Sequence, residues 1–383
     1  MAIIINQPRV DLLIVLSSLA AEGCPQLALQ LTRHWLQQGL QVDLLCLHSE
    51  HIDLRPEFEA LGIPIHTFDL GKGLGRYPRL AWLSYMLCRS RRPTALLSFP
   101  LGWHFLIALG ARAAGVQRVC AHSGNLPPVW TGNAFRKFKF LVQLGRPLTD
   151  RLLCCSEYIR TATVRDFAVT PRETRGIFNA CDLERFVDLS RNSISQPHEP
   201  PLIGVVGRLD GNRDYSGLIR SISKLRDQGL AVDLLLIGEG SHRPQLERLI
   251  VDLDLAERVQ LLGTRRDIPK FLSQLDVFLW PALSLEGFGI ALAEAMAAGV
   301  PIVATDVGAC REVLDGGRCG LLVEPGNPAA LADGIRQVLN DPSAAVERAK
   351  LARQRALRDF SVESMAQAYG EELGLGMPKD WVA

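Results

Sequence analysis

Two glutamates within residues 283–307 are the side chains of this 383-residue chain best placed to do chemistry. In the segment LSLEGFGIALAEAMAAGVPIVATDV, Glu286 stands before a glycine-rich turn and Glu294 lies inside the apolar stretch that follows it. The pattern predicts a strand at 277–279 and a helix at about 288–298, which a glycine and then a proline bring to an end. The two carboxylates therefore bracket a strand-to-helix turn.

The start of this expected helix predicts an anion site. The backbone N–H groups of Gly287, Phe288, Gly289 and Ile290 are expected to point out of the helix N-terminus. Unpaired N–H groups and the helix dipole together favour a phosphate there.

Glu294 stands in an otherwise apolar helix, where a carboxylate is costly unless hydroxyl or amide groups bind it. The hydroxyls of a ribose would serve. The alternative is a plain capped core helix with Glu294 on an exposed strip.

Alternating strands and helices must position these groups. Apolar runs at 10–16, 42–47, 95–98, 118–121 and 151–154 alternate with amphipathic stretches. A second series of expected strands follows at 202–206, 232–237, 259–262, 277–279, 302–304 and 320–323. This is the pattern of parallel sheets covered by helices, in which ligands bind at the carboxyl ends of the strands.

The polar, proline-containing segment 190–200 separates the two series and is interpreted as a linker. We expect an N-terminal domain over 1–195, which binds the acceptor, and a C-terminal domain over 196–360, which binds the donor. The C-terminal helix, at about 361–383, is expected to pack back on the first domain.

The second half of the chain resembles the donor half of the retaining glycosyltransferases of family 4. The motifs are VVGRLDGNRD, LLIGEG, RVQLLGTRRDIPKFLSQLDVFLWPA, the EGFGIALAEAMAAGVPIVATDVG block and GLLVEPGNPAAL, in the family's order. The first half is similar more loosely, through LLIVLSSLAAEG, LCCSEYIR and GIFNACDLERF. The resemblance implies an α/β GT-B fold, with two Rossmann-like doubly wound domains facing a cleft.

The resemblance also implies roles for the matching residues. Glu294 would bind the ribose of a nucleotide-sugar and Glu286 the hydroxyls of the transferred sugar, while residues 287–290 would bind sugar and phosphate through their backbone. Arg208 and Arg213 would hold the diphosphate. The family usually has lysine at the second of these positions, so at Arg213 a planar guanidinium replaces the compact ammonium group of lysine.

Three further positions match less closely. In the glycine loop after the first strand, only Gly23 of the family's Gly-Gly-Ala-Glu-Arg pattern remains, and Glu22 would repel a diphosphate unless it faced away. His122, in VCAHSGNL, resembles the active-site histidine that touches the sugar, although a structural histidine at a strand end is the alternative. Arg265 lies in the loop at 263–266, which we expect to contribute to base recognition.

The implied function is a hexosyltransferase-type glycosyltransferase that acts in envelope, lipopolysaccharide or exopolysaccharide synthesis. A UDP-sugar is expected as donor more than a GDP-sugar, and a saccharide or lipid-linked molecule as acceptor. Family membership implies retention, and since no carboxylate nucleophile is evident, we expect front-face attack with the leaving phosphate helping to deprotonate the acceptor. Developing charge would be stabilised by cations and the helix N-terminus, with no metal and no cofactor.

Two other functions stay open: a nucleotide-sugar epimerase or hydrolase on the same scaffold, and a non-catalytic binding protein. Other motifs fail. Asp252 and Asp254 fit a metal signature but lie at a helix end, and Gly238-Glu239-Gly240 lacks the rest of a dinucleotide fingerprint.

Charge is distributed unevenly, although the chain as a whole carries +1. No acidic residue occurs from 70 to 149, which holds 12 basic residues. The segment 135–148 mixes basic and apolar residues at helical spacing, which favours an interfacial helix that meets an anionic membrane and a phosphate-bearing lipid-linked acceptor. An acidic saccharide groove or simple surface charge is the alternative. Nucleic acid is not expected, because no aromatic platform accompanies the charge.

The chain is expected to be cytoplasmic, and peripheral on the inner face of the membrane if the basic segment binds lipid. Apolar runs reach only about ten residues, whereas a membrane-spanning helix needs roughly 20. The nine cysteines show no zinc spacing and are interpreted as small core residues of a reduced protein.

Overall fold

The computed structural model describes residues 9–20, 23–50, 52–68, 70, 73–126, 132–187, 198–211 and 213–376. Contacts divide the chain into two compact units: unit 1 comprises 1–179 and 362–383, and unit 2 comprises 180–361. The division falls earlier than the expected boundary at residue 195. The reason is that Cys181 donates a backbone hydrogen bond to Phe360, and Arg353 donates to the carbonyl of Phe186, so these residues pack with unit 2.

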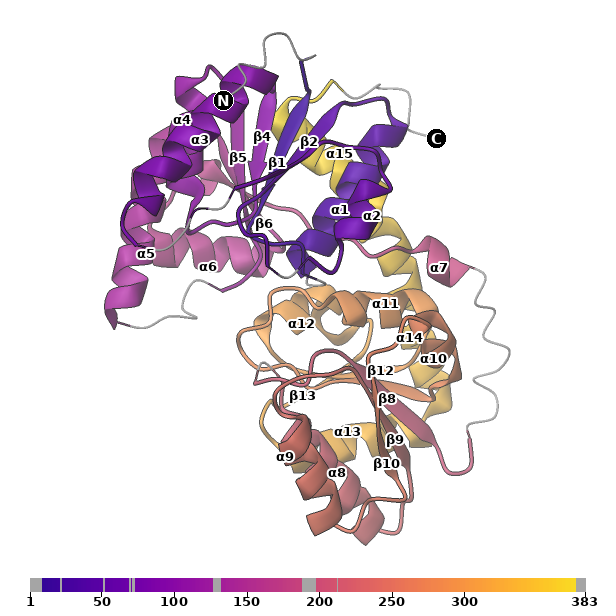
Figure 1. The fold of residues 1–383 in the computed structure, drawn as a ribbon. Coiled ribbons are helices and arrows are strands. Elements are labelled where there is room, and N and C mark those ends of the chain that lie inside the picture. Colours follow the sequence, from indigo (N-terminus) through magenta and orange to yellow (C-terminus); the bar gives the residue numbers. More distant parts are fainter. Residues whose placement is uncertain are drawn as a thin grey trace. The chain divides into compact units, whose positions relative to one another are not determined.

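Unit 1 is built on a seven-stranded parallel sheet with the order β3-β2-β1-β4-β5-β6-β7 (Figure 1). The central strands are wholly buried, as their near-continuous apolar sequence predicts. The strands are β1 (Leu12–Leu16), β2 (Val42–Cys46), β3 (Ile65–Thr67), β4 (Ala95–Ser98), β5 (Arg118–Ser123), β6 (Arg151–Cys154) and β7 (Thr174–Gly176).

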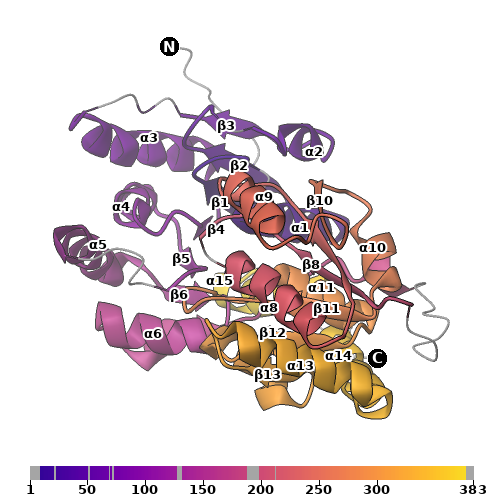
Figure 2. The ribbon, with the colours of Figure 1, turned by 90° about the horizontal axis from the view of Figure 1, so that it is seen from below.

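The helices of unit 1 cover both faces of this sheet. Helices α3, α4 and α5 pack in succession on one face, and α1 packs against α15 on the other (Figure 2). The helices are α1 (Gly23–Gln37), α2 (Arg55–Glu59), α3 (Arg76–Arg91), α4 (His104–Ala113), α5 (Gly132–Gly145), α6 (Glu157–Phe167) and α15 (Val362–Leu373), with 3-10 turns η2 (Arg146–Leu148) and η3 (Pro171–Glu173). The chain therefore returns to unit 1 through its last helix.

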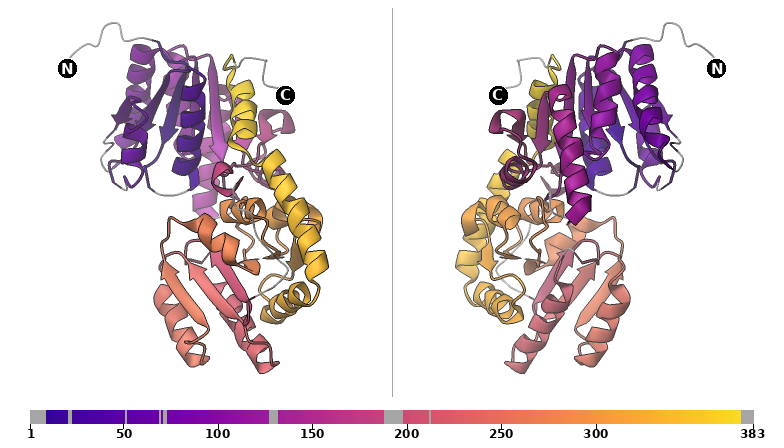
Figure 3. Two further views of the ribbon diagram at one scale, coloured as in Figure 1. Left: turned by 90° about the vertical axis from the view of Figure 1, so that its right-hand side faces the viewer. Right: turned by 90° about the vertical axis from the view of Figure 1, so that its left-hand side faces the viewer.

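Unit 2 is built on a six-stranded parallel sheet with the order β10-β9-β8-β11-β12-β13, seen from two sides in Figure 3. The strands are β8 (Leu202–Val206), β9 (Asp233–Ile237), β10 (Val259–Gly263), β11 (Val277–Trp280), β12 (Ile302–Thr305) and β13 (Leu321–Val323). The helices are α7 (Glu184–Val187), α8 (Tyr215–Asp227), α9 (Arg243–Asp252), α10 (Ile268–Gln274), α11 (Ile290–Ala298), α12 (Gly308–Val313), α13 (Pro328–Asn340) and α14 (Pro342–Asp359), with the turn η4 (Asp315–Gly317).

Two short edge strands, β3 and β7, were not expected from the sequence. Each has three residues, and their side chains are mostly half-buried, so no apolar run marks them. The expected helix over 135–148 is α5 together with η2, and the regular helix ends at Gly145. Most of the expected linker lies outside the described residues.

All nine cysteines are free, and eight are buried. Within the described residues, no helix is both long and apolar enough to cross a bilayer.

Candidate functional site

Helix α11 begins at Ile290, two residues later than expected. Gly289 precedes it with a φ of +87°, a left-handed conformation that a helix cannot contain. Gly287 and Phe288 therefore belong to the turn rather than the helix, and Phe288 packs its ring edge-on against Phe360 at 5.2 Å. Among the described residues no side chain caps α11. The anion site expected at this helix start stays a prediction, and its N–H donors are now those that begin at Ile290.

Arg213 and Glu286 meet at this turn. The Arg213 Nη2 and Glu286 Oε2 atoms lie 3.4 Å apart, and both side chains are largely buried. The guanidinium carbon lies 4.1 Å from the ring centroid of Trp280, the last residue of β11. A flat guanidinium can stack on a flat ring, which an ammonium group cannot do as well, and this accounts physically for arginine at this position.

Trp280 also packs against the turn before α11. A side chain at Gly289 would meet two atoms of the Trp280 ring at 3.2 Å, so the ring lies directly beneath the glycine. Trp280 thus contacts both the cation and the residue before the helix. No sequence pattern singles out Trp280, because a large apolar residue at the end of a buried strand is common.

Glycines bring the neighbouring loops close together. A Cβ at Gly238 would lie 2.0 Å from the carbonyl oxygen of Gly207, and one at Gly207 would lie 2.9 Å from Arg213 Nη1. The Gly-Glu-Gly segment after β9 therefore allows close backbone approach and leaves room for the Arg213 side chain. Arg208 follows Gly207 and pairs with Asp210 at 3.0 Å, with its side chain 60% exposed.

Glu294 lies on α11, and burial raises its pKa to about 7, with Arg185 opposing and Asp182 reinforcing the shift. Arg185 belongs to α7, which packs against α11. Arg185 also donates to the backbone carbonyl of Arg266 at 2.9 Å. It thus links the carboxylate expected to bind ribose with the loop expected near the base, a connection that the sequence did not indicate.

Arg265 lies in that same loop. It pairs with Asp267 at 3.2 Å, and its guanidinium carbon lies 5.1 Å from the centroid of the Phe271 ring. The side chain is partly exposed and held in place on two sides.

His122 lies at the end of β5 in unit 1 and is almost fully buried. Its Nδ1 atom is hydrogen-bonded to the Tyr369 hydroxyl at 2.8 Å, and burial lowers its pKa to about 4. A Cβ at Gly124 would lie 2.8 Å from Nε2, so that glycine makes room for the ring. His122 is therefore a neutral imidazole oriented by a tyrosine of α15, a partner that the sequence did not predict.

Gly23 is the first residue of α1 and is exposed. It follows β1, so it lies at the same carboxyl edge of the sheet as His122. Glu22 lies outside the described residues.

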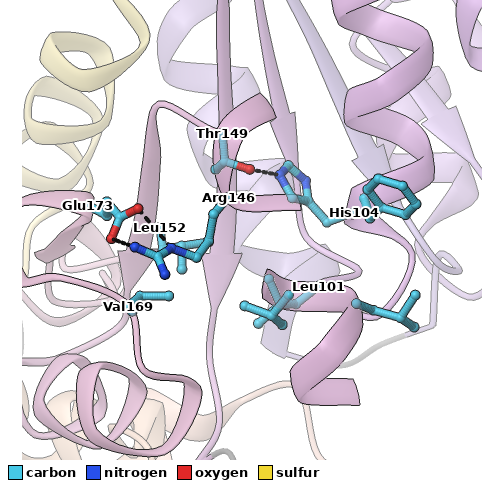
Figure 4. Close-up of a pocket in the computed structure, with 10 residues that line it drawn as sticks. Leu101, His104, Arg146, Thr149, Leu152, Val169 and Glu173 are labelled. Atoms are coloured by element: carbon cyan, nitrogen blue, oxygen red, sulfur yellow. Dashed lines mark hydrogen bonds and ion pairs between the residues drawn. The ribbon is translucent and has the colours of Figure 1, made fainter. Parts of the chain in front are cut away.

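A small cavity in unit 1 lies apart from these residues (Figure 4). Its free volume of about 10 Å³ has room for roughly one water molecule. The polar groups that line it pair with one another: Arg146 binds both oxygens of Glu173 at 2.9 Å, and His104 Nε2 lies 2.8 Å from the Thr149 hydroxyl. This cavity belongs to the packing of unit 1 and is too small for a nucleotide.

The profile described as Glycosyl transferases group 1 matches residues 187–355, and the profile described as Glycosyltransferase Family 4 matches residues 22–185. Together they match most of the chain.

Among curated proteins, the chain is similar to the N-acetylgalactosamine-N,N'-diacetylbacillosaminyl-diphospho-undecaprenol 4-alpha-N-acetylgalactosaminyltransferase of Campylobacter jejuni. The two are 31% identical over 61% of this chain and 64% of that protein. The lipopolysaccharide core biosynthesis glycosyltransferase LpsE of Rhizobium meliloti is 30% identical over 52% of this chain and 57% of its own length. The chain thus spans less than two thirds of these relatives.

Solved structures show the same fold. Anabaena Alr3699/HepE in complex with UDP has a TM-score of 0.81 at 19% identity, covering 95% of this chain and 99% of that one. The outer core galactosyltransferase WaaB has a TM-score of 0.75 at 13% identity, covering 96% and 99%. The expected GT-B fold is confirmed.

Proposed function

The chain belongs to the group 1 glycosyltransferase family, and from that premise we propose that it moves a sugar from a UDP-sugar to a saccharide or lipid-linked acceptor with retention at the anomeric carbon. The observation that carries the proposal is the largely buried Arg213–Glu286 pair beside the start of α11, which no side chain among the described residues caps. Together they offer a cation and backbone N–H groups to a diphosphate, and a carboxylate to sugar hydroxyls. UDP and UDP-glucose are bound by the structural neighbour HepE, which supports a uridine donor.

In this mechanism, negative charge grows on the departing nucleoside diphosphate. Arg213, Arg208 and the α11 N-terminus stabilise that charge, and the carboxylate of Glu294 receives the ribose hydroxyls. The leaving phosphate accepts the proton of the attacking acceptor hydroxyl on the same face of the sugar. His122 is a proposed catalytic residue of unit 1, and its neutral state suits a hydrogen bond to a sugar hydroxyl.

The test begins with donor binding. UDP, GDP and their sugars are screened by thermal shift, and a true ligand at 100 times its Kd should stabilise the protein by about 2.7 kcal/mol. Arg213→Gln should abolish the UDP response, whereas Arg220→Gln, an exposed arginine on α8, should leave it intact. Equal responses in both variants would remove Arg213 from the donor site.

Turnover then decides the reaction type. Transfer from a UDP-sugar to an acceptor, with product anomer read by NMR, should give the configuration of the donor. Donor breakdown that needs no acceptor would indicate a hydrolase or epimerase instead. A trapped covalent glycosyl-enzyme would overturn the front-face mechanism.

We also propose that the acceptor side of the protein works at an anionic membrane surface, with acceptors of the cell envelope. The helices α3 and α5 carry exposed apolar side chains, including Trp82 at 50% and Phe140 at 60%, and Leu74 before α3 is 83% exposed. These lie within the acid-free span. Flotation with anionic vesicles should succeed at low salt and fall when Trp82 and Phe140 are replaced by serine. Absence of binding at low salt would contradict the proposal.

A further inference from the structure

Four side chains form a compact group in unit 1, which we call the cation–aromatic cluster: Arg76, Tyr77, Trp103 and Lys137. The Tyr77 and Trp103 ring centroids are 5.6 Å apart. The Arg76 guanidinium carbon lies 5.2 Å from the Tyr77 centroid and 5.0 Å from that of Trp103. Lys137 Nζ lies 5.6 Å from the Tyr77 centroid, so two cations share one aromatic ring.

Each member comes from the connection that follows a strand. Arg76 and Tyr77 open α3 after β3, Trp103 precedes α4 after β4, and Lys137 lies in the second turn of α5 after β5. In a parallel sheet these connections gather at the carboxyl edge, where ligands of doubly wound folds bind. The cluster therefore lies at the same edge of the sheet as His122 and Gly23.

The positive charges of the cluster have no acidic partner within the part of the chain that the structure describes. Other arginines of the acid-free span do find one: Arg91 pairs with Asp43, Arg112 with Asp150 and Arg146 with Glu173. Arg76 and Lys137 instead hold their charges close together, and the buried Nε of Arg76 lacks a hydrogen-bond partner among the described residues. Two like charges held together are repulsive, and a bound anion removes that cost.

The tyrosine hydroxyl is poised to add a third donor. Arg76 Nη2 and Lys137 Nζ approach Tyr77 Oη at 3.4 and 3.5 Å, both as donors. These contacts lower the pKa of Tyr77, with the Arg76 hydrogen bond as the larger cause. Since the oxygen accepts from both cations, its own proton can be donated to a ligand.

We propose that the cation–aromatic cluster is an anion subsite that receives the phosphate of a phosphorylated sugar acceptor. This rests on the proposed function, because a phosphate on the acceptor is useful only if the chain transfers to it. The fork of Arg76, the point charge of Lys137 and the hydroxyl of Tyr77 match the several oxygens of a phosphate better than the two of a carboxylate. Tyr77 and Trp103 hold the Arg76 guanidinium in position.

The aromatic pair corrects one premise drawn from the sequence, whereas the expectation that the chain does not bind nucleic acid stays a prediction. Nucleic acid was not expected because no aromatic platform accompanies the basic span, yet the structure shows Tyr77 and Trp103 beside two of its cations. Non-specific single-strand binding uses several stacked bases in succession. Tyr77 and Trp103 form a single ring pair, and Arg76 already packs against both rings. This arrangement suits one phosphate group better than a row of stacked bases.

The test measures binding of glucose 1-phosphate by calorimetry with the donor site saturated by UDP. Arg76→Gln and Lys137→Gln should each weaken binding about tenfold or more, and Tyr77→Phe should weaken it severalfold. Arg89→Gln, which removes an exposed charge from the last turn of α3, is the matched control and should bind as the original protein does. Loss of UDP binding, measured on the same samples, would count against the proposed function and not against this subsite.

Other probes separate the outcomes. Methyl glucoside should not bind, and glucuronate should bind much more weakly; equal binding of glucuronate would overturn the choice of phosphate. A single-stranded oligonucleotide that bound in a cluster-dependent way, more tightly than the sugar phosphate, would also overturn it. If Arg89→Gln weakened binding as much as Arg76→Gln, binding would depend on the overall positive charge of unit 1 and not on the cluster. That result would refute the subsite.

A final pair of probes identifies the source of the phosphate. Glucose phosphate attached to a long prenyl chain in neutral vesicles is compared with the free sugar phosphate. In both cases cluster variants should reduce binding. Tighter binding of the prenyl-linked probe supports a lipid-linked acceptor, and equal binding supports a soluble phosphosugar with the same subsite. Cluster variants that reduced neither would refute the proposal.

Discussion

Replacing Glu294 by glutamine should stabilise unit 2 while it weakens donor binding. Burial raises the pKa of Glu294 from 4.5 to about 7, and each pH unit corresponds to about 1.4 kcal/mol between the two protonation states. The full difference is roughly 3 kcal/mol, and since the side chain is only partly removed from solvent, we expect about 2 kcal/mol. The amide has the same shape without the charge, so it avoids this cost.

The sign of the pH dependence follows from the direction of the shift. Well below pH 4.5 the carboxyl is protonated in both the folded and the unfolded chain, and at pH 4.5 only about half of the unfolded chains have ionised it, so the substitution should change stability little there. As pH rises from 4.5 to 7, the unfolded chain ionises first and the stability of unit 2 falls. The advantage of Glu294→Gln should therefore grow across this window and level off above pH 7.

Thermal unfolding at pH 4.5 and pH 8 measures the effect. For a domain of this size, about 2 kcal/mol corresponds to a Tm increase of roughly 4–8 °C at pH 8. Glu257→Gln, at an exposed position of unit 2, is the control and should shift Tm little. UDP affinity of Glu294→Gln should fall by a factor of about ten to a hundred, because charge-assisted hydrogen bonds to the ribose are lost.

The same experiment can refute the reasoning. A Tm increase that is equal at both pH values would mean that ionisation of Glu294 is not its cause. An unchanged UDP affinity would remove Glu294 from the donor site. In the original protein, UDP affinity should also fall as pH drops below 7, and this dependence should be absent in Glu294→Gln.

Four further outcomes are expected. Trp280→Leu should raise the KM for the donor severalfold, because the Arg213 guanidinium loses the ring it stacks on; an unchanged KM would show that the ring does not position the cation. Gly238→Ala should destabilise unit 2 by more than about 2 kcal/mol in urea unfolding, because the added methyl would overlap the Gly207 carbonyl. Burial lowers the pKa of both His104 and His122 to about 4, so each imidazole binds its proton first in the unfolded chain, and each should cost unit 1 about 2 kcal/mol of stability between pH 6.5 and 4.5. His104→Asn should remove about half of this dependence, and an equal slope in both proteins would contradict it. Removal of divalent metal with EDTA should leave sugar transfer unchanged, whereas metal-dependent activity would require a different leaving-group mechanism.

The sequence by itself determined the parallel α/β architecture of each unit and singled out the region of the proposed donor site. Buried parallel strands read as short apolar runs because both of their faces are covered, so β4, β6 and β8 were predicted with their exact bounds. Glu294 stood out because a carboxylate in an apolar helix needs a partner. These signals are local, and neighbouring residues are enough to produce them.

The tertiary structure decided the contacts between residues far apart in the chain. The pairing of Arg213 with Glu286 and Trp280 joins loops after different strands, and the tyrosine that orients His122 comes from a helix 247 residues away. The start of α11 moved because Gly289 adopts a left-handed conformation, which a sequence pattern does not reveal.

The cation–aromatic cluster also depends on contacts between residues far apart in the chain, which the sequence does not reveal. Arg76, Trp103 and Lys137 are separated by tens of residues, and only the parallel order of β3, β4 and β5 in one sheet brings their loops to one edge. The sequence showed that the span lacks acid, which is a property of composition. Which of its cations are paired and which are held together depends on side chains elsewhere in unit 1, such as Asp43 and Glu173.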